Sequence, residues 1–355
     1  MFCLSFSRPL AAVAAALLVF ASAAPPPAAA QEAHGTAEGV ARDARDGTPL
    51  PLLLVRLLPT GPGAVPRGVV TDAEGRFRFE GVPAGEYRLQ VEQIGYERTQ
   101  SPVLRVRAGQ TLFHEIRGSA RPVQLEGVTV HGGRCLTADQ LASDGDLSAL
   151  WNEAKKGVET RRAFNLQYRY TRIMRQDIRA RWRIRGTTRT EKVDTFVNKP
   201  DSVLVREQRR RARLRANGYM DGGYLTLPSE TDLLDDEFLR DHCLEPSFDE
   251  VEGAFVLRFR PVRTRRDGVG IRGVITVDAQ SYLIRRLDFD YLRGDRPFGA
   301  SYVVYEDLAV AGSTLRLPAR GGGSARAEGV GRVAALGASS TFTFHYGGFD
   351  RTGPE

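Results

Sequence analysis

The sequence has few of the residues and motifs on which the common enzyme classes depend. It contains three cysteines and five histidines in 355 residues. It has no GxSxG nucleophile elbow, no P-loop and no glycine-rich dinucleotide turn after a strand. No CxxC pair is present, so a thiol redox motif is excluded. We therefore expect a protein without catalysis and without a cofactor.

Long apolar runs are confined to residues 1–30. Arg8 is the only charge before the run LAAVAAALLVFASAA, and an Ala-x-Ala end places a cleavage site after Ala30. The run is shorter than the ~20 residues of a spanning helix, so an uncleaved anchor is the less favoured alternative. Residues 1–30 predict a signal peptide. We expect an exported chain, not an integral membrane protein, in the periplasm, on the outer-membrane surface or outside the cell.

If the chain is exported, its cysteines are expected to form a disulfide. Cys3 precedes the apolar run and is too early for a lipoprotein acceptor cysteine, which leaves Cys135 and Cys243. In an oxidising compartment an even pair favours a disulfide over two free thiols or a catalytic thiol. A loop of this length would stabilise the fold by about 4–5 kcal/mol in the chain-entropy account.

Residues 34–117 show a strand pattern of period two. Apolar and polar residues alternate over Arg76–Phe79 and again over Tyr87–Val91. Asp72 and Gly75 are typical of the turn between such strands, because the carboxylate accepts backbone hydrogen bonds and glycine adopts a positive φ. About seven short strands, with turns every eight to twelve residues, predict an antiparallel Greek-key sandwich.

A family resemblance rests on these same motifs. The spaced motif G-x-V-x-D-x-x-x-G-x-P-L, with small shifts near Gly39–Leu50, precedes V-T-D-x-x-G-x-F-x-F-x-x-V-P-x-G-x-Y and I-G-Y. This series resembles the carboxypeptidase regulatory-like domain. The resemblance implies a transthyretin-like, carbohydrate-binding-like sandwich. Such modules stand beside metallocarboxypeptidase domains, at the front of TonB-dependent receptors and in secreted proteins of unknown role, so it implies a scaffold and a compartment rather than an activity.

One motif leaves a zinc carboxypeptidase-like enzyme as an alternative. That family holds zinc with an HxxE pair and a distant histidine, and His242, Glu245 and His345 have this order. The family's catalytic domain is helix-rich and precedes the regulatory module, whereas the residues after this module show mostly β patterns. Cys243, inside the motif, has a simpler role as a disulfide partner. We expect no bound metal and keep these three residues as the candidates to test.

A second alternative is an accessory component of a TonB-dependent outer-membrane transport system. After the sandwich, Leu125, Val128 and Val130 resemble the short strand that precedes a receptor plug. A complete receptor also needs a plug and a large barrel, which we do not expect here. The segment more simply completes the edge of the sandwich domain, residues 34–130, and leads into a linker at 131–146.

The C-terminal domain, residues 147–350, is expected to be rich in β structure. GAFVLRFRPV, YLIRRLDFDYL and TFTFHYGG each alternate with period two. They predict an antiparallel curved sheet or half barrel with one or two helices, whose concave side is where we expect an apolar or glycan ligand. One face of the first helix is apolar: Leu147, Leu150, Trp151, Ala154 and Val158.

The segment RGVITVDAQSYLIRRLDFDY, residues 272–291, resembles an uncharacterised partner domain that follows regulatory-like modules in secreted bacterial proteins. Its expected sheet is similar to periplasmic lipoprotein-carrier domains. We therefore expect a mainly β, non-catalytic binding or adaptor protein of the bacterial cell envelope. Its partner would be a glycan, an anionic envelope surface or an outer-membrane protein.

Charge is concentrated in two blocks of opposite sign. Residues 168–215 contain sixteen lysines and arginines against five acids, and residues 230–252 contain ten acids against one arginine. If the strand carrying Arg179 and Arg181 faces the acidic block, the charges complement each other within the fold. Nucleic acid is not expected, because an exported chain without a recognition motif is a poor candidate. The alternative is contact with anionic lipid or polysaccharide through Arg209, Arg210, Arg211 and Arg213.

Overall fold

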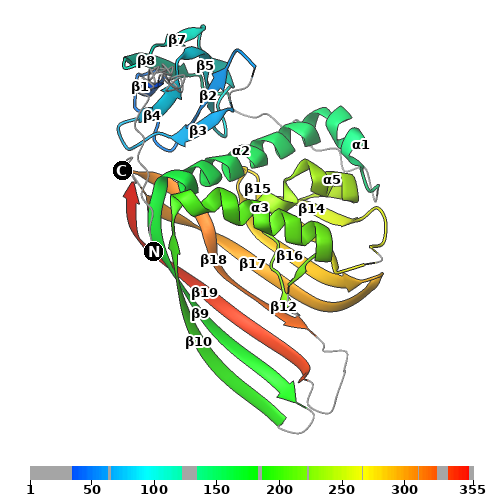
Figure 1. The fold of residues 1–355 in the computed structure, drawn as a ribbon. Coiled ribbons are helices and arrows are strands. Elements are labelled where there is room, and N and C mark those ends of the chain that lie inside the picture. The colour runs from blue at the N-terminus through cyan, green and yellow to red at the C-terminus, as the bar shows by residue number, and fades with distance from the viewer. Residues whose placement is uncertain are drawn as a thin grey trace, which may run out of the picture.

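The computed structural model describes residues 34–62, 65–121, 134–182, 186–221, 224–265, 267–310, 312–325 and 335–351. The predicted signal peptide and the receptor-like segment around Val128 lie outside these residues. Within them the chain is mainly β and forms two packed units, here called the sandwich unit, residues 34–121, and the large-sheet unit, residues 134–351 (Figure 1).

The sandwich unit packs two sheets face to face. One sheet has the order β4-β1-β8 and the other β3-β2-β5-β6, with β7 also beside β5. The strands are β1 His34–Asp43, β2 Leu54–Pro59, β3 Arg67–Val70, β4 Arg76–Pro83, β5 Gly85–Glu92, β6 Thr99–Gln100, β7 Leu104–Val106 and β8 Thr111–Gly118.

This architecture confirms the predicted sandwich, with two differences. The unit has eight strands rather than seven, and β8 runs parallel to β1 rather than antiparallel. The parallel pair arises because the chain crosses to the other sheet after β4, forms β5, β6 and β7 there, and only then returns beside β1 as β8. Sequence periodicity does not report strand direction, so alternation alone could not distinguish the two pairings.

The predicted turn before β4 is confirmed in detail. Asp72 Oδ1 accepts hydrogen bonds from Glu74 N at 3.1 Å and Arg76 N at 2.7 Å. Gly75 has φ +76°, and a Cβ there would lie 2.5 Å from Ala41 O. Phe77 and Phe79 then point inward and are almost fully buried in the core of the unit.

The large-sheet unit confirms the predicted curved antiparallel sheet. Nine strands follow the order β10-β9-β19-β18-β17-β16-β15-β14-β13, and the sheet does not close into a barrel. Strands β11 Met220–Asp221 and β12 Tyr224–Leu225 form a separate small hairpin. The nine strands are β9 Tyr168–Trp182, β10 Gly186–Asn198, β13 His242–Asp249, β14 Ala254–Pro261, β15 Gly270–Asp278, β16 Ile284–Arg293, β17 Arg296–Val310, β18 Ser313–Ala325 and β19 Ala335–Arg351.

Five helices accompany this sheet, where the sequence predicts one or two. They are α1 Ala138–Ser143, α2 Gly145–Gln167, α3 Pro200–Asn217, α4 Glu230–Leu233 and α5 Asp236–Asp241. Helix α1 lies within the segment predicted as a linker. Helix α3 buries only Pro200 and Val203, so its sequence lacks the apolar stripe by which a helix is recognised. None of the helices in the described residues is long and apolar enough to cross a membrane.

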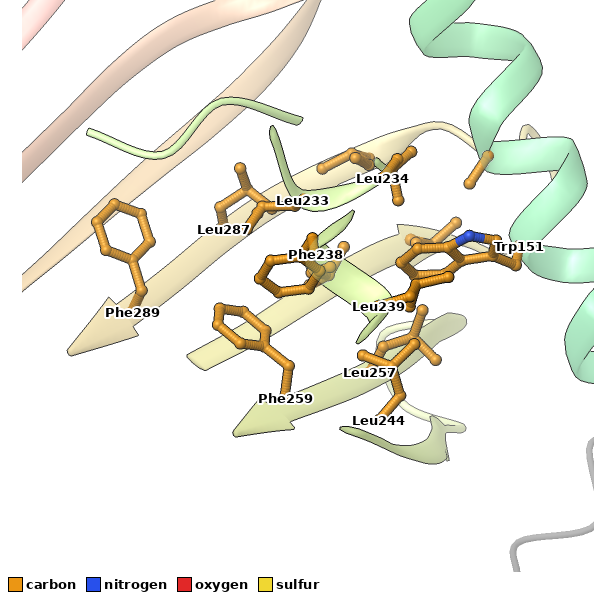
Figure 2. Packing of buried hydrophobic residues seen from close by; sticks show 14 of the residues in the cluster. Trp151, Leu233, Leu234, Phe238, Leu239, Leu244, Leu257, Phe259, Leu287 and Phe289 are labelled. Carbon is orange, nitrogen blue, oxygen red and sulfur yellow. The ribbon is translucent and has the colours of Figure 1, made fainter. Parts of the chain in front are cut away.

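Helices cover the apolar face of the large sheet. Trp151 of α2 and Phe238 of α5 pack on Leu257, Phe259 and other residues that alternate along the strands (Figure 2). The sequence analysis expects an apolar or glycan ligand on the concave side of this sheet, and over these strands that side is filled by helix side chains. The apolar side chains there bury one another between helix and sheet.

Helix α2 also packs against the sandwich unit. Phe164 near its C-terminus is fully buried in a cluster with Leu54 and Val70 of the sandwich and Leu317 of the large sheet. Polar contacts surround this cluster. Val70 N donates to Gln167 Oε1 at 2.5 Å, and Arg56 pairs with both Glu92 of β5 and Glu159 of α2. The two units therefore share a continuous interface.

Candidate functional site

The structure separates the three candidate metal ligands. His242 and Leu244 point to the helix-covered face of β13, and Glu245, three residues after His242, points to the opposite face because side chains alternate along a strand. His345 is on β19, with five strands between it and β13. At about 4.8 Å per strand, that separation is roughly 25–30 Å along the sheet.

The His242 ring has its own structural contacts. Its Nδ1 lies 3.0 Å from Phe238 O and its Nε2 3.3 Å from Ile271 O, and the ring stacks on Phe238 with 4.0 Å between centroids. Burial lowers the pKa of His242. In the described residues no three histidine, cysteine or acidic side chains come together as a metal site. The arrangement supports a packing role for this histidine.

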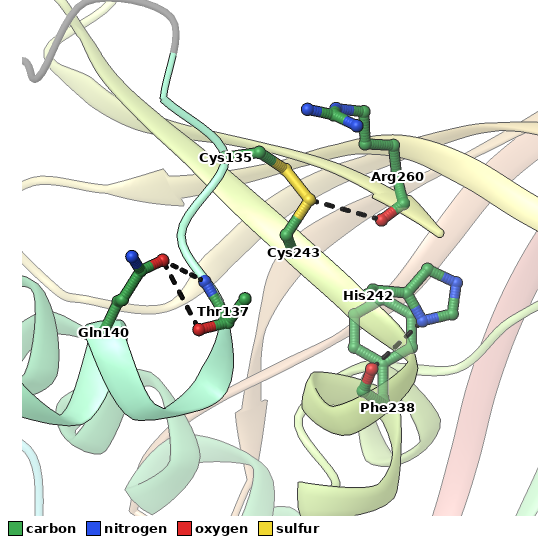
Figure 3. The surroundings of a disulfide bond; sticks show 7 residues. All are labelled: Cys135, Thr137, Gln140, Phe238, His242, Cys243 and Arg260. Carbon is green, nitrogen blue, oxygen red and sulfur yellow. Dashed lines mark hydrogen bonds between the residues drawn. A yellow bond between two sulfur atoms is a disulfide. The ribbon is translucent and has the colours of Figure 1, made fainter. Parts of the chain in front are cut away.

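The predicted cysteine pair forms a disulfide. Cys135 and Cys243 are joined across a sequence separation of 108 residues, with 5.2 Å between their Cα atoms (Figure 3). Beside it, Leu136 N donates to Leu244 O at 2.7 Å and Leu244 N donates to Leu136 O at 2.9 Å. The disulfide and these two hydrogen bonds hold the segment before α1 against the outer edge of β13.

The arginine run of α3 faces the acidic block. Arg210 Nε lies 3.0 Å from both carboxylate oxygens of Asp232, and Arg211 pairs with Asp235 at 3.0 Å. The charges complement each other within the fold, but through helix α3 rather than through the strand carrying Arg179 and Arg181. That strand, β9, lies far from β13 in the sheet. Of the candidate anionic contacts, Arg209, Arg211 and Arg213 are exposed on α3, and Arg210 is partly buried.

A groove of about 720 Å³ lies beside the sandwich unit. Its floor is the outer face of the sheet β4-β1-β8, and its far wall is the C-terminal end of α2, at Leu166 and Gln167, together with Arg351. We call it the Phe113 groove, after the exposed aromatic side chain on its floor. Phe113 is 61% exposed although it is a large aromatic residue.

Charged side chains flank Phe113 across the strands. In the sheet register Glu38 lies between Phe113 of β8 and Arg78 of β4, and Arg78 forms ion pairs with Glu38 and Glu80. The hydrogen bond to Glu80 raises the pKa of Arg78. Arg76 is exposed on the same face and lines the groove, and its guanidinium has no hydrogen-bonding partner among the described side chains. The groove therefore offers an aromatic face, a free cation and carboxylate acceptors together.

The wall of the Phe113 groove is fixed by hydrogen bonds. Arg67 Nη1 donates to Glu80 O at 2.7 Å. Arg351 reaches across from the large-sheet unit, with Nη1 3.4 Å from Asp72 Oδ2 and Nη2 3.3 Å from Val70 O. Asp72, which shapes the turn before β4, thus also contacts the wall. Guanidinium and carboxylate groups nearly balance in the lining, so the groove has little net charge.

The sequence analysis did not single out this groove. One signal was available: in TLFHEIRG, Phe113 shares the polar face of β8 with Thr111, Glu115 and Arg117. An aromatic residue in an otherwise polar set is the one local feature that sets this face apart, although a single exposed apolar side chain is common on protein surfaces. The rest of the groove depends on residues that are distant in sequence, since Arg351 and Gln167 come from the other unit.

The comparisons with known proteins agree with the sandwich. The model of the carboxypeptidase regulatory-like domain family matches residues 36–117, which confirms the resemblance drawn from the motifs. No curated protein matches the chain.

Similarity to solved structures is low. The minor pilin GBS52 of Streptococcus agalactiae is 19% identical, with 26% of this chain and 47% of that chain covered and a TM-score of 0.22. A DUF3823 family protein from Parabacteroides merdae is 8% identical, with 73% and 96% covered and a TM-score of 0.21. The major pilin BcpA of Bacillus cereus is 11% identical, with 86% of this chain and 95% of that chain covered and a TM-score of 0.22. The chain spans about half the length of the first two structures it matches. Scores at this level carry no argument about function.

Proposed function

We propose that this chain is an exported, non-catalytic binding protein of the bacterial cell envelope, and that the Phe113 groove binds a saccharide. The observation that supports the proposal is the exposed ring of Phe113 in a concave site. Beside it are the Glu38–Arg78 pair and Arg76, whose guanidinium has no partner among the described side chains. Binding sites are typically concave and combine apolar surface with a few placed polar groups.

A saccharide matches this combination of groups. A sugar ring has an apolar C–H face that packs on an aromatic side chain, and its hydroxyls both donate and accept hydrogen bonds. Arginine supplies donors only and an ionised carboxylate supplies acceptors only, and the groove contains both. A strongly anionic ligand fits less well, because the carboxylates of Glu38, Asp72 and Glu80 line the same space.

Export and the rejection of the zinc carboxypeptidase-like alternative have separate support. The disulfide between Cys135 and Cys243 is typical of an oxidising compartment, in line with the predicted signal peptide. The residues that a zinc carboxypeptidase-like activity would need, His242, Glu245 and His345, lie on different faces and distant strands.

Affinity electrophoresis of the oxidised mature chain tests the proposal. Native gels would contain a soluble β-glucan, an α-glucan or a sulfated polysaccharide, and we expect retardation by at least one neutral glycan. Phe113→Ala should weaken that retardation by at least about tenfold, which corresponds to about 1.4 kcal/mol. Phe248→Ala is the matched control, because Phe248 is 41% exposed on β13, far from the groove.

Two results would contradict the proposal. The first is migration of the wild-type chain that is unchanged in all three gels. The second is retardation that Phe113→Ala leaves intact. Retardation only in the sulfated gel, lost on replacing Arg209 and Arg213 with alanine, would instead favour the anionic-surface alternative.

A further inference from the structure

The two edges of the large sheet differ in how they are closed. The outer edge of β13 is occupied by the segment around Leu136, which is held by two backbone hydrogen bonds and the disulfide. At the other edge, β10 pairs with β9 from Gly186 to Asn198, and no described strand pairs with its outer side. Such an edge presents unpaired backbone donors and acceptors to any strand that fits.

Strand β10 lacks three features that often protect an edge, namely a proline, a bulge and a short length. It contains no proline, its register with β9 has no bulge, and its length is about 44 Å at roughly 3.4 Å per residue. Its charges are neutralised locally, since Lys192 pairs with Asp194 at 2.7 Å and Arg189 pairs with Asp177 and Glu191. Three apolar side chains on this strand are exposed: Val193 at 59%, Phe196 at 41% and Val197 at 42%.

The sequence of β10 is complementary to itself in one antiparallel register. When a two-fold axis relates two edge strands of one continuous sheet, each residue faces a residue of the same side-chain face. An axis at Val193 puts the two Val193 side chains together and places Lys192 of each copy opposite Asp194 of the other. Shifting the axis by one residue puts Lys192 against Lys192 or Asp194 against Asp194, which is repulsive.

Only one other position of the two-fold axis places oppositely charged residues of the two copies directly opposite each other. An axis at Thr190 pairs Arg189 with Glu191, but the overlap then ends at Gly186 and Asp194 because β10 begins at Gly186. With the axis at Val193 the overlap runs from Thr188 to Asn198. It is therefore longer and includes the exposed Phe196 and Val197.

We propose that two copies of this chain associate through β10, with the two-fold axis at Val193, so that the large sheet continues from one copy into the other. In this register Val193 lies opposite Val193 of the other copy, so residues with outward-facing N–H and C=O groups always lie opposite each other. The backbone hydrogen bonds can therefore form whichever alternate residues of β10 carry those groups. The inference is independent of the saccharide proposal, since no residue of β10 lines the Phe113 groove.

Sedimentation equilibrium of the oxidised mature chain over a range of concentrations tests this dimer. The wild-type mass should rise from the monomer toward twice that value. Lys192→Asp and Asp194→Lys each replace two cross-strand attractions with repulsions, so each variant alone should dimerise at least about tenfold more weakly. An equimolar mixture of the two variants restores both attractions and should form a heterodimer.

The charge swap separates this interface from a folding defect, because a misfolded variant would not regain association on mixing. Lys155→Asp is the control, since Lys155 lies on α2 and forms an exposed pair with Asp236. A wild-type chain that stays monomeric up to about 1 mM would overturn the proposal. So would single variants that associate as strongly as the wild type, or a mixture that does not associate.

Discussion

The sandwich unit and the large-sheet unit bury their sheets in different ways. In the sandwich, two sheets face each other and the core consists of alternating apolar side chains such as Phe77 and Phe79. In the large-sheet unit, helices cover the sheet, and buried charges help to attach them. Glu230 of α4 pairs with Arg161 of α2 and accepts a hydrogen bond from Tyr305 of β17 at 2.5 Å, and Glu230 is 3% exposed. The second unit therefore adds a disulfide and a buried ion pair between helices to its apolar core.

Of the changes that distinguish the two units, removing the disulfide should have the largest effect on stability. Replacing both Cys135 and Cys243 with serine should lower the free energy of unfolding of the large-sheet unit by about 4 kcal/mol, because the unfolded chain loses a long closed loop. Both tryptophans, Trp151 and Trp182, are in this unit. Urea denaturation followed by tryptophan fluorescence measures the change. Amide exchange in β4 and β5 should stay at wild-type levels if the two units differ as described.

Breaking the buried ion pair should have the next largest effect. Glu230→Gln leaves the Arg161 guanidinium, whose side chain is 12% exposed, without its anion. The expected loss is about 3 kcal/mol, again by tryptophan fluorescence. Glu38→Gln in the sandwich removes a solvent-exposed pair with Arg78 and should cost little. Amide exchange in β4 measures that loss, because both tryptophans are in the other unit. Equal losses in the two variants would contradict the contrast.

Acid should weaken the large-sheet unit through Asp278. Burial alone would raise the pKa of this carboxyl, but hydrogen bonds from Ser281 and Arg285 lower it to about 2. The unfolded value is higher, so the carboxylate stabilises the fold above about pH 4, and this stability is lost as the pH falls toward 2. The loss should be at most about 2 kcal/mol. Asp278→Asn should flatten that slope between pH 4 and 2, as measured by urea denaturation at each pH.

The smallest effect is expected at the interface between the units. Gln167→Ala removes the acceptor for Val70 N and should cost about 1 kcal/mol. Hydrogen exchange at the Val70 amide should become faster, with little change in the core of either unit. A matched control is Arg169→Ala, because Arg169 is exposed on β9. If Gln167→Ala instead lowers the free energy of unfolding of both units, the two units are coupled through this interface.

The same contrast explains how much the sequence predicted. Alternation around Phe77 and the turn residues Asp72 and Gly75 encode the sandwich locally, so the motifs identified it. Helix α2 was predicted because its apolar face repeats at helical spacing. Helix α3 was not, because its contacts are ion pairs to Asp232 and Asp235, which lie in a different segment.

The candidate site was predicted less well than the fold. The HxxE spacing of His242 and Glu245 suits a helix, but these residues are on a strand, where the two side chains diverge. The Phe113 groove needs Arg351 beside Asp72, a contact across almost the whole chain that no local pattern contains. The disulfide was predictable, because the compartment and the cysteine count alone were enough.

The contact between helix α2 and the sandwich affects whether the sandwich could be transferred to another protein. Modules of this kind are recognised as separable domains, but here the loop with Ile94 and Gly95 rests on α2. Gly95 N donates to Glu153 Oε2 at 3.2 Å, and a Cβ on Gly157 would lie 3.2 Å from Ile94 Cδ1. Excised at the limits of the family match, the sandwich would expose Leu54 and Val70 to water. A transplanted copy would need the helix as well, so the unit that can be moved between proteins extends beyond the recognised domain to about residue 167.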